Sequence, residues 1–207
     1  MASIKQGNIE FESGDETIRY NYLQQGETTK ILGLHITRCS WTAQHAIKTA
    51  KKANKIISYL YAVRGFSTRN KLYLIKTLVI PILLYPCVPL NASSIATIAT
   101  LQTVLNRALR FAFGVRYPDM PTARSLHIRA KIKPINIMLY KRAKNLWAKL
   151  ESGHAGDRNT FEDIIGTPIE KPHTWFPSSY TRAQKPEPPP MYTRQEGSSP
   201  QLVAYYN

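Results

Sequence analysis

The stretch TTKILGLHITRCSWTAQHAIKTAKKANK, residues 28–55, places a strand-like segment directly before a lysine-rich segment with helical spacing. Residues 30–36, KILGLHI, are rich in Leu and Ile and predict a β-strand. From residue 43 to residue 61 the apolar positions recur at steps of three and four, which predicts an amphipathic helix. The opposite face of this helix carries a stripe of lysines: Lys48, Lys51, Lys52 and Lys55.

Two more strand-like segments precede this stretch. Apolar and polar residues alternate around Ile9 and Phe11 and again in IRYNYL, residues 18–23, and the turn signals SGDE and QQGE separate the segments. Three strands of this length cannot bury a core by themselves. We therefore expect residues 1–37 to form a short antiparallel β edge of a sheet whose remainder lies elsewhere.

Further helices are predicted after the basic one. Residues 67–80, STRNKLYLIKTLVI, are apolar on nearly all sides, with Ser67 as a helix cap and Pro81 as the point where the helix stops or kinks. Residues 94–113 and 134–151 have the same helical spacing, and Pro134 suits a first turn. The fold class is therefore mainly α, with a small helical bundle over residues 38–150.

The composition changes after residue 150. Eight of the 14 prolines of the chain lie beyond it, including PEPPP at residues 186–190, with Ser, Gly and Thr between them. Such a composition favours extended, unpacked backbone. We expect residues 151–207 to form a Pro-rich linker or a disordered tail.

The positive charge is concentrated in the middle of the chain. Residues 30–150 contain 21 Lys and Arg but only one acid, Asp119, whereas the segments on either side are net negative. A block this one-sided indicates a polyanionic partner, with nucleic acid first and an anionic membrane second. The longest apolar run, residues 77–90, is too short to span a bilayer and contains three prolines, which disfavours a membrane.

The candidate binding residues are the basic side chains of two predicted helices. The lysine stripe can follow a phosphate backbone, and lysine suits contact without sequence preference because its ammonium is a point charge. Arginines of the 94–113 helix and its exit add to this surface. The alternative for the stripe alone is a solvated helix face. The predicted nucleic-acid-binding residues are Lys48, Lys51, Lys52, Lys55, Arg107, Arg110 and Arg116.

Motifs for catalysis are absent from the basic block. Two-metal phosphoryl chemistry needs paired carboxylates, and residues 28–118 contain no Asp or Glu. The five His and two Cys lack the spacing of a zinc site, and no phosphate-binding glycine loop occurs. We expect no catalytic residue, no metal, no cofactor and no small-molecule substrate in this chain. The two distant cysteines and the absence of a secretory signal suit an intracellular location, nuclear or cytoplasmic.

Four segments resemble, in order and spacing, the C-terminal part of the reverse transcriptase of non-LTR retrotransposons, closest to jockey-like elements. They are KILGLHI, STRNKLYLIKTLVIPILLY, LQTVLNRALRFAFGV and LHIRAKIKPINIMLYKR, and the resemblance covers roughly residues 5–150. It implies that the helices form a thumb, which grips the template-primer duplex through its backbone. It also implies that Leu32, Gly33 and Leu34 belong to the hairpin at the end of the palm that positions the primer.

The chain departs from this family in two respects. The Y-x-D-D loop that carries catalytic aspartates does not occur, and Tyr85 to Pro89 replace the Tyr-Gly and Trp usual after the second thumb helix. The resemblance therefore implies a fragment of an RNA-directed DNA polymerase that binds template-primer nucleic acid without catalysis of its own. Two alternatives stay open: a helical interaction protein for an anionic membrane or acidic partner, and an enzyme whose palm comes from another chain. The oligomeric state is left open.

Overall fold

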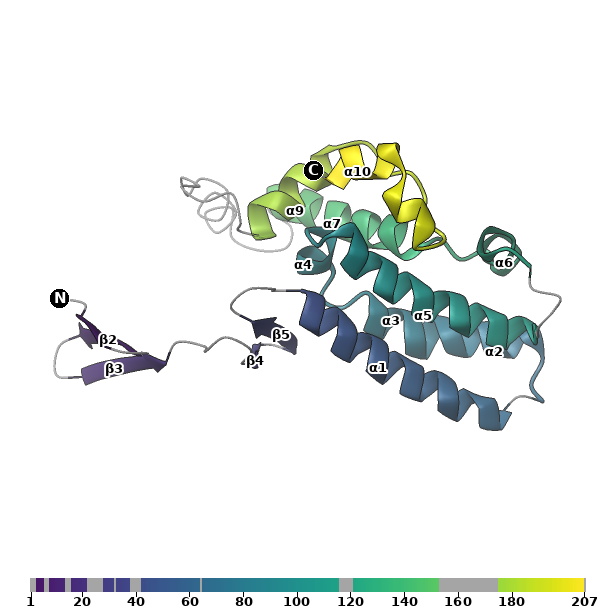
Figure 1. Cartoon of the computed structure of the whole chain (residues 1–207), viewed down its shortest axis with the longest axis horizontal. Coiled ribbons are helices and arrows are strands. Elements are labelled where there is room, and N and C mark those ends of the chain that lie inside the picture. Colours follow the sequence, from purple (N-terminus) through teal and green to yellow (C-terminus); the bar gives the residue numbers. More distant parts are fainter. Residues whose placement is uncertain are drawn as a thin grey trace. The chain divides into compact units, whose positions relative to one another are not determined.

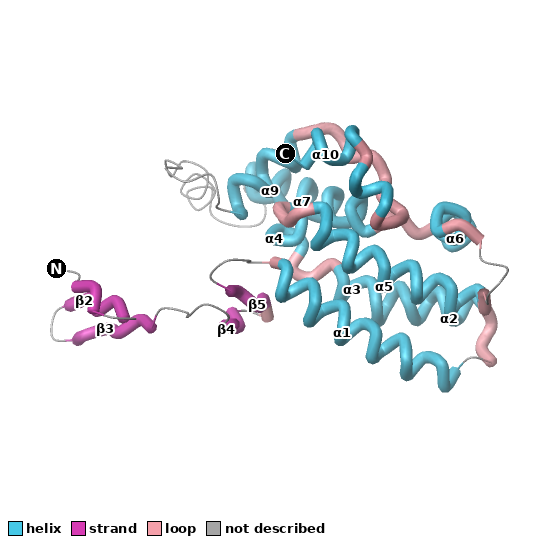
Figure 2. Tube along the Cα trace, viewed as in Figure 1, coloured by secondary structure: helices cyan, strands magenta, loops and turns pink. Residues whose placement is uncertain are grey.

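A computed structural model describes residues 3–5, 8–13, 16–21, 28–31, 33–37, 42–63, 65–115, 121–152 and 175–206. The chain divides into two compact units, residues 1–45 and 46–207. Figure 2 shows that strands are confined to the first unit and that helices make up most of the second. The predicted mainly α class, with a short antiparallel β edge before the helices, is confirmed.

The first unit contains two small antiparallel sheets. Strands β1 (Ser3–Lys5), β2 (Asn8–Ser13) and β3 (Glu16–Asn21) form one sheet, in that order. Strands β4 (Thr28–Ile31) and β5 (Leu34–Thr37) form a hairpin in which Ile31 pairs with Leu34. The single strand predicted over residues 30–36 is therefore wrong. Gly33 has a φ of +83° in the turn, a conformation that glycine adopts without strain, so the chain reverses there.

The helices of the chain follow in sequence. They are α1 (Ala43–Leu60), η1 (Tyr61–Val63), α2 (Thr68–Leu74), η2 (Ile75–Val79), α3 (Ile80–Leu83), α4 (Cys87–Asn91), α5 (Ile95–Phe113), α6 (Ala123–Ala130), α7 (Ile135–Glu151), α9 (Trp175–Gln184), η3 (Gln195–Ser198) and α10 (Pro200–Tyr206). The side chains of Ser67 and Ser94 cap α2 and α5 by accepting hydrogen bonds from backbone N–H groups. Gly114, with a φ of +65°, ends α5 in the left-handed conformation.

The predicted 67–80 helix is interrupted where Pro81 was expected to disturb it. The chain passes from α2 through a π-helical turn, η2, into α3, and Pro81 lies in the first turn of α3. A proline ring clashes with the carbonyl four residues earlier and offers no N–H, and a wider turn relieves both problems. The expectation that this segment is apolar on nearly all sides and buried is only half right, because Tyr73 and Leu78 are exposed.

Helix α5 is the centre of the second unit. Figure 1 shows it running between α1, α2 and α3 on one side and α7 and the C-terminal helices on the other. Its residues Leu101, Leu105 and Leu109 are fully buried. They share one hydrophobic core with Ile57 of α1 and Leu139 of α7. Because the apolar spacing of each helix determines which face is buried, these inward positions could be read from the sequence.

A buried polar network crosses this core. Gln102 of α5 donates from Nε2 to Asn106 Oδ1 at 2.8 Å and lies 2.9 Å from His127 Nε2, and its Oε1 accepts from the N–H of Ile135 at 2.8 Å. His127 Nδ1 lies 2.9 Å from the carbonyl oxygen of Ile132, so Nδ1 carries a proton, and Nε2 lies 2.9 Å from both Gln102 Nε2 and Asn106 Oδ1. The network joins α5, α6 and the start of α7.

The C-terminal segment, residues 175–206, is folded onto the helical unit. The expectation of a linker or disordered tail is therefore wrong for these residues, while residues 153–174 lie outside the described part of the chain. Ala183, Met191 and Leu202 are buried, and Met191 and Leu202 join the main core. Trp147 of α7 stacks edge-on against Tyr180 with ring centroids 5.4 Å apart. Proline-rich composition did not prevent packing because buried side chains anchor the segment at several points.

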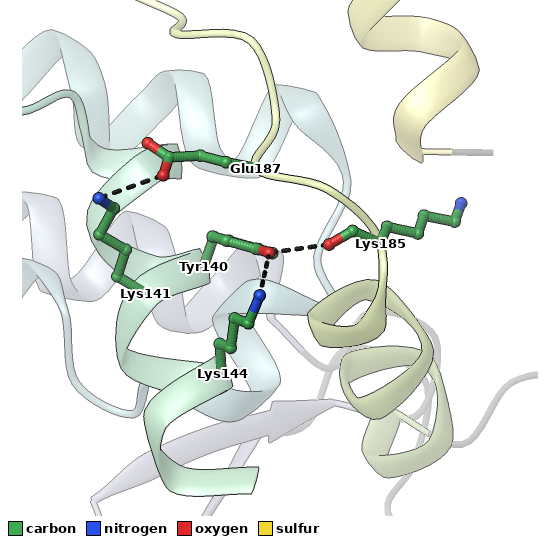
Figure 3. Close-up of polar contacts among 5 residues, drawn as sticks. All are labelled: Tyr140, Lys141, Lys144, Lys185 and Glu187. Carbon is green, nitrogen blue, oxygen red and sulfur yellow. Dashed lines mark hydrogen bonds and ion pairs between the residues drawn. The ribbon is translucent and has the colours of Figure 1, made fainter. Parts of the chain in front are cut away.

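Hydrogen bonds to backbone atoms fix the extended part of this segment. Asn136 donates to the Pro189 carbonyl at 2.8 Å and accepts from the Met191 N–H at 3.2 Å. Figure 3 shows Tyr140 of α7 donating to the Lys185 carbonyl at 2.8 Å, beside the ion pair of Lys141 with Glu187 at 3.1 Å. Polar side chains of α7 thus satisfy a backbone that prolines prevent from forming regular structure.

Arg182 ties the C-terminal segment to two other places in the unit. Its Nη1 donates to the carbonyls of Asn91 and Ser93, both at 2.8 Å, and its Nη2 donates to the carbonyl of Tyr206 at 2.9 Å. The guanidinium also lies over the Tyr206 ring, 4.7 Å from its centroid. One side chain therefore satisfies carbonyls at the end of α4, before α5 and at the end of α10.

We predict that Arg182→Met lowers the free energy of unfolding by about 2 to 3 kcal/mol, because it leaves partly buried carbonyls without their charged donor. Urea unfolding measures the loss, and limited proteolysis should show cleavage within 175–206 that the parent resists. The matched control is Arg194→Met, in the same segment but exposed, which should change stability by less than about 0.5 kcal/mol. Equal losses in the two variants would contradict the anchoring role of Arg182.

The buried histidine predicts a pH dependence. Burial lowers the pKa of His127, and the hydrogen bond to the Ile132 carbonyl offsets only part of that effect. An unfolded histidine has a pKa of about 6.5, so below that pH the unfolded chain binds a proton that the folded chain does not. The free energy of unfolding should therefore fall as pH decreases from about 6.5 toward the lower pKa of the folded state. Urea unfolding at several pH values should show a shallower fall in His127→Gln, and identical profiles would contradict the assignment.

Candidate nucleic-acid interface

The lysine stripe lies on the exposed side of α1. Lys51, Lys52 and Lys55 are exposed and Lys48 is half-buried, while the apolar positions Ala46, Ala50, Ala53 and Ile57 of the same helix are buried. Seven residues of helix span about 10 Å, so the four ammonium groups can follow neighbouring phosphates of one strand. The structure thus places the predicted stripe on one surface of α1.

Arg107 of α5 extends this surface. It is exposed, and its Nη1 donates to the Oδ1 atom of Asn54 at 3.0 Å. Asn54 lies between Lys51 and Lys55 on α1, so the hydrogen bond holds a fifth cation beside the stripe. Two helices that are distant in sequence therefore contribute to one basic surface, as predicted for Arg107.

Arg110 occupies a different environment from the one expected. It was predicted to add to the basic surface of the lysine stripe, but it is only half-exposed and lines a cavity of about 430 Å³. Its Nε is buried and has no hydrogen-bond partner among the described residues. The other residues that line the cavity are Tyr61, Gly65, Lys71, Phe111, Gly114 and Val115.

Lys71 is a residue that the sequence analysis did not select. Only 9% of its surface is exposed, and its Nζ lies 5.4 Å from the centroid of the Phe111 ring. The sequence does set Lys71 apart, since Lys71 and Lys76 are the two charged residues in the mostly apolar run of residues 71–80. Lys76, the other one, is exposed. Helical spacing alone did not separate a buried lysine from a solvated one.

Of the remaining predicted site residues, the structure describes only some. Arg116 and Leu32 lie outside the described residues. Gly33 forms the turn of the β4–β5 hairpin and Leu34, 7% exposed, begins β5. The structure therefore has a hairpin at the position where the resemblance implies one.

Exposed aromatic rings occur in the same part of the chain as the basic surface. Tyr59, Tyr61, Phe66 and Tyr73 are all more than 45% exposed. Lys55 Nζ lies 5.9 Å from the Tyr59 ring centroid, and Tyr61 contacts Phe111 with centroids 4.8 Å apart. Exposed rings beside cations can stack on bases.

Carboxylates are absent from the surroundings of these cations in the described part of the second unit. The described acids of that unit are Glu151, Glu187 and Glu196, which lie on or after the end of α7. Glu187 pairs with Lys141, and Glu196 accepts hydrogen bonds from the backbone N–H groups of Tyr192 and Thr193. Helices α1, α2 and α5 therefore contain cations but no acid, which gives this part of the described unit a one-sided positive charge.

Other kinds of site have little support in the described residues. No group of three or more His, Cys, Asp or Glu side chains among them is arranged to hold a metal ion. Burial raises the pKa of the Cys87 thiol, although Arg142 partly opposes this, so the thiol is less reactive than an ordinary cysteine. None of the described helices combines the length and the apolar character needed to cross a membrane.

Comparisons with known proteins identify no relative of this chain. No protein-family model matches the sequence, and no curated protein or solved structure shows significant similarity to the chain.

Proposed function

We propose that the helical unit binds nucleic acid through backbone phosphates, without sequence preference and without catalysis of its own. The observation that carries the proposal is the surface formed by the lysine stripe of α1 and by Arg107, which hydrogen-bonds to Asn54 within that stripe. Cations held on adjacent helices match the repeating charge of a phosphate backbone. The template-primer duplex of a reverse transcriptase is the partner that this surface and the resemblance together favour.

The proposal extends to the origin of the chain. The order of hairpin, basic helix and further helices supports a palm edge followed by a thumb, derived from an RNA-directed DNA polymerase of a jockey-like retrotransposon. A thumb holds the duplex by its backbone and leaves the chemistry to aspartates of the palm. Such a fragment would act where nucleic acid is present, in the nucleus or the cytoplasm.

The energetics favour exposed lysines as contacts for a polyanion. Lys51, Lys52 and Lys55 are exposed and make no ion pair with a carboxylate among the described residues, so phosphates can reach these three ammonium groups directly. Each phosphate neutralised releases condensed counterions, which makes the affinity depend steeply on salt. Exposed Tyr59 and Tyr73 add surfaces on which unpaired bases can stack where a duplex ends.

We predict that replacing the four stripe lysines with Gln weakens binding to all duplex sequences alike. If about five phosphates are neutralised, log K should fall with log[salt] at a slope of about −4 to −5, and the variant should flatten that slope by up to about 3 to 4. Helicity should hardly change, because Gln is nearly as good a helix former as Lys. Binding titrations at several salt concentrations measure both quantities. The variant replaces Lys48, Lys51, Lys52 and Lys55.

The matched control removes the same charge from another surface. It replaces four exposed cations on and before α7 with Gln, and it should change the slope by less than about 1. Equal effects of the two variants would show that net charge, rather than the stripe, governs binding. Binding of both proteins to anionic vesicles, with no binding to nucleic acid, would favour the membrane alternative instead. The control variant replaces Lys131, Lys133, Arg142 and Lys149.

A second prediction concerns catalysis. The purified chain, given template-primer, nucleotides and Mg²⁺, should add no nucleotide above background, because residues 28–118 provide no carboxylate pair to hold the metal ions. A primer-extension assay with a known reverse transcriptase as positive control measures this. Template-dependent extension by this chain alone would refute the proposal that it binds without catalysis.

A further inference from the structure

We propose that the cavity between η1, α2 and the end of α5 is a binding site for one phosphate group, with Lys71 and Arg110 as its ligands. This site is separate from the exposed lysine stripe, because it is concave and its cations are partly or largely buried. The proposed site depends on the proposed function in one respect only, namely that a bound nucleic acid would be the source of the phosphate.

The first argument is the pairing of two cations in one small space. Lys71 and Arg110 both line a cavity of about 430 Å³, and neither makes a hydrogen bond or an ion pair with a described residue. Lys71 is nine-tenths buried, and the Arg110 Nε is wholly buried. Buried polar groups are almost always hydrogen-bonded, so an unpaired N–H in such a place points to a partner outside the described residues.

The second argument is electrostatic. Like charges that line one cavity repel each other and lose part of their hydration there, and a bound anion would compensate for both effects. The Phe111 ring beneath the Lys71 ammonium provides some attraction, but an aromatic face cannot accept the several N–H donors of the two side chains. An anion that accepts several hydrogen bonds resolves both problems.

The third argument is the shape of the wall. Gly65 and Gly114 line the cavity, and a Cβ added to either would meet nothing within 4 Å, so both leave space open. Gly114 has a φ of +65°, which also keeps larger residues out of this position. The arginine presents a planar fork that matches two phosphate oxygens, and the lysine adds a point charge. This donor set fits a phosphate better than it fits a monatomic anion.

The position of the cavity connects it to the proposed interface. Arg107 and Arg110 are three residues apart on α5 and therefore lie on one face of the helix. Arg107 reaches the lysine stripe through Asn54, and Arg110 at the cavity lies about one helical turn farther along α5. A nucleic acid that follows the stripe could place a backbone or terminal phosphate there, and a free nucleotide phosphate has the same chemistry.

The test uses inorganic phosphate alone on the full chain, so that it does not depend on nucleic-acid binding. At constant ionic strength, phosphate in place of chloride should raise the melting temperature of the parent, because a ligand that binds the folded state stabilises it. Lys71→Met keeps the length of the stem and removes the charge, and it should weaken phosphate binding about tenfold or more, as does Arg110→Gln. The matched control, Lys76→Met, should respond to phosphate as the parent does.

A second readout separates loss of binding from loss of folding. In chloride without phosphate, Lys71→Met should melt no lower than the parent, because the ammonium has no hydrogen bond or ion pair with a described residue to lose and a methionine can still pack on Phe111. A phosphate response that survives unchanged in both Lys71→Met and Arg110→Gln would overturn the site. A double-mutant cycle gives a second outcome that would overturn the site. If Asp119→Asn lowers the stability of the parent but not that of Lys71→Met, the two residues are coupled, and the counter-charge of Lys71 comes from the chain itself.

Duplexes of one sequence, with and without a 5′-phosphate, identify the source of the phosphate. If Lys71→Met loses affinity only for the phosphorylated duplex, the site holds a strand end, and if it loses affinity equally for both, the site holds the backbone. If it loses affinity for neither but still loses the phosphate response, the site serves a free phosphate or nucleotide. In that last case the phosphate site would be supported without being part of the nucleic-acid interface, and the proposed function would be judged on the lysine stripe alone.

Discussion

The amide of Gln102 is the point on which the helical unit depends. It is fully buried, and its donors and acceptor meet Asn106, His127 and the N–H of Ile135. Asn106 in turn donates to the Tyr192 carbonyl at 2.7 Å, so four segments meet at one network. Apolar faces tolerate sliding, but buried hydrogen bonds have one geometry and a high penalty when broken. The network therefore selects a single arrangement of α5, α6, α7 and the C-terminal segment.

The basic residues of the unit fall into two physical classes. Lys51, Lys52, Lys55 and Arg107 are exposed to water, which screens each charge, so their attraction for a polyanion comes from the sum of several weak contributions. Lys71, which is largely buried, and Arg110, whose Nε is buried, line one cavity, where water screens a charge less than it does at the open surface. Exposed cations give attraction without selectivity, whereas enclosed ones can recognise a group by its shape. Both classes lie along α1, α2 and α5.

Much of the fold could be predicted from local patterns, because a capping residue such as Ser67 or Ser94 marks the start of a helix within a few residues of sequence. The stripe on α1 followed from the same periodicity. The C-terminal segment could not be predicted, since Met191 and Leu202 are buried by partners far away in the sequence. Lys71 was missed for the same reason: its burial depends on Phe111, forty residues later, and no periodicity within α2 reveals that contact.

The C-terminal segment also bears on how quickly the unit can assemble. Its hydrogen bonds join Arg182 to Asn91 and Tyr192 to Asn106, which are separated by 91 and 86 residues. Contacts at such separations require a large loop to close before they contribute, and a high contact order slows folding. Helices α1 to α5 are joined by contacts at shorter separations, such as the 53 residues between Asn54 and Arg107, and can associate earlier. The unit should therefore pass through a collapsed helical intermediate whose α7 surface, including Trp147, is uncovered until the C-terminal segment docks.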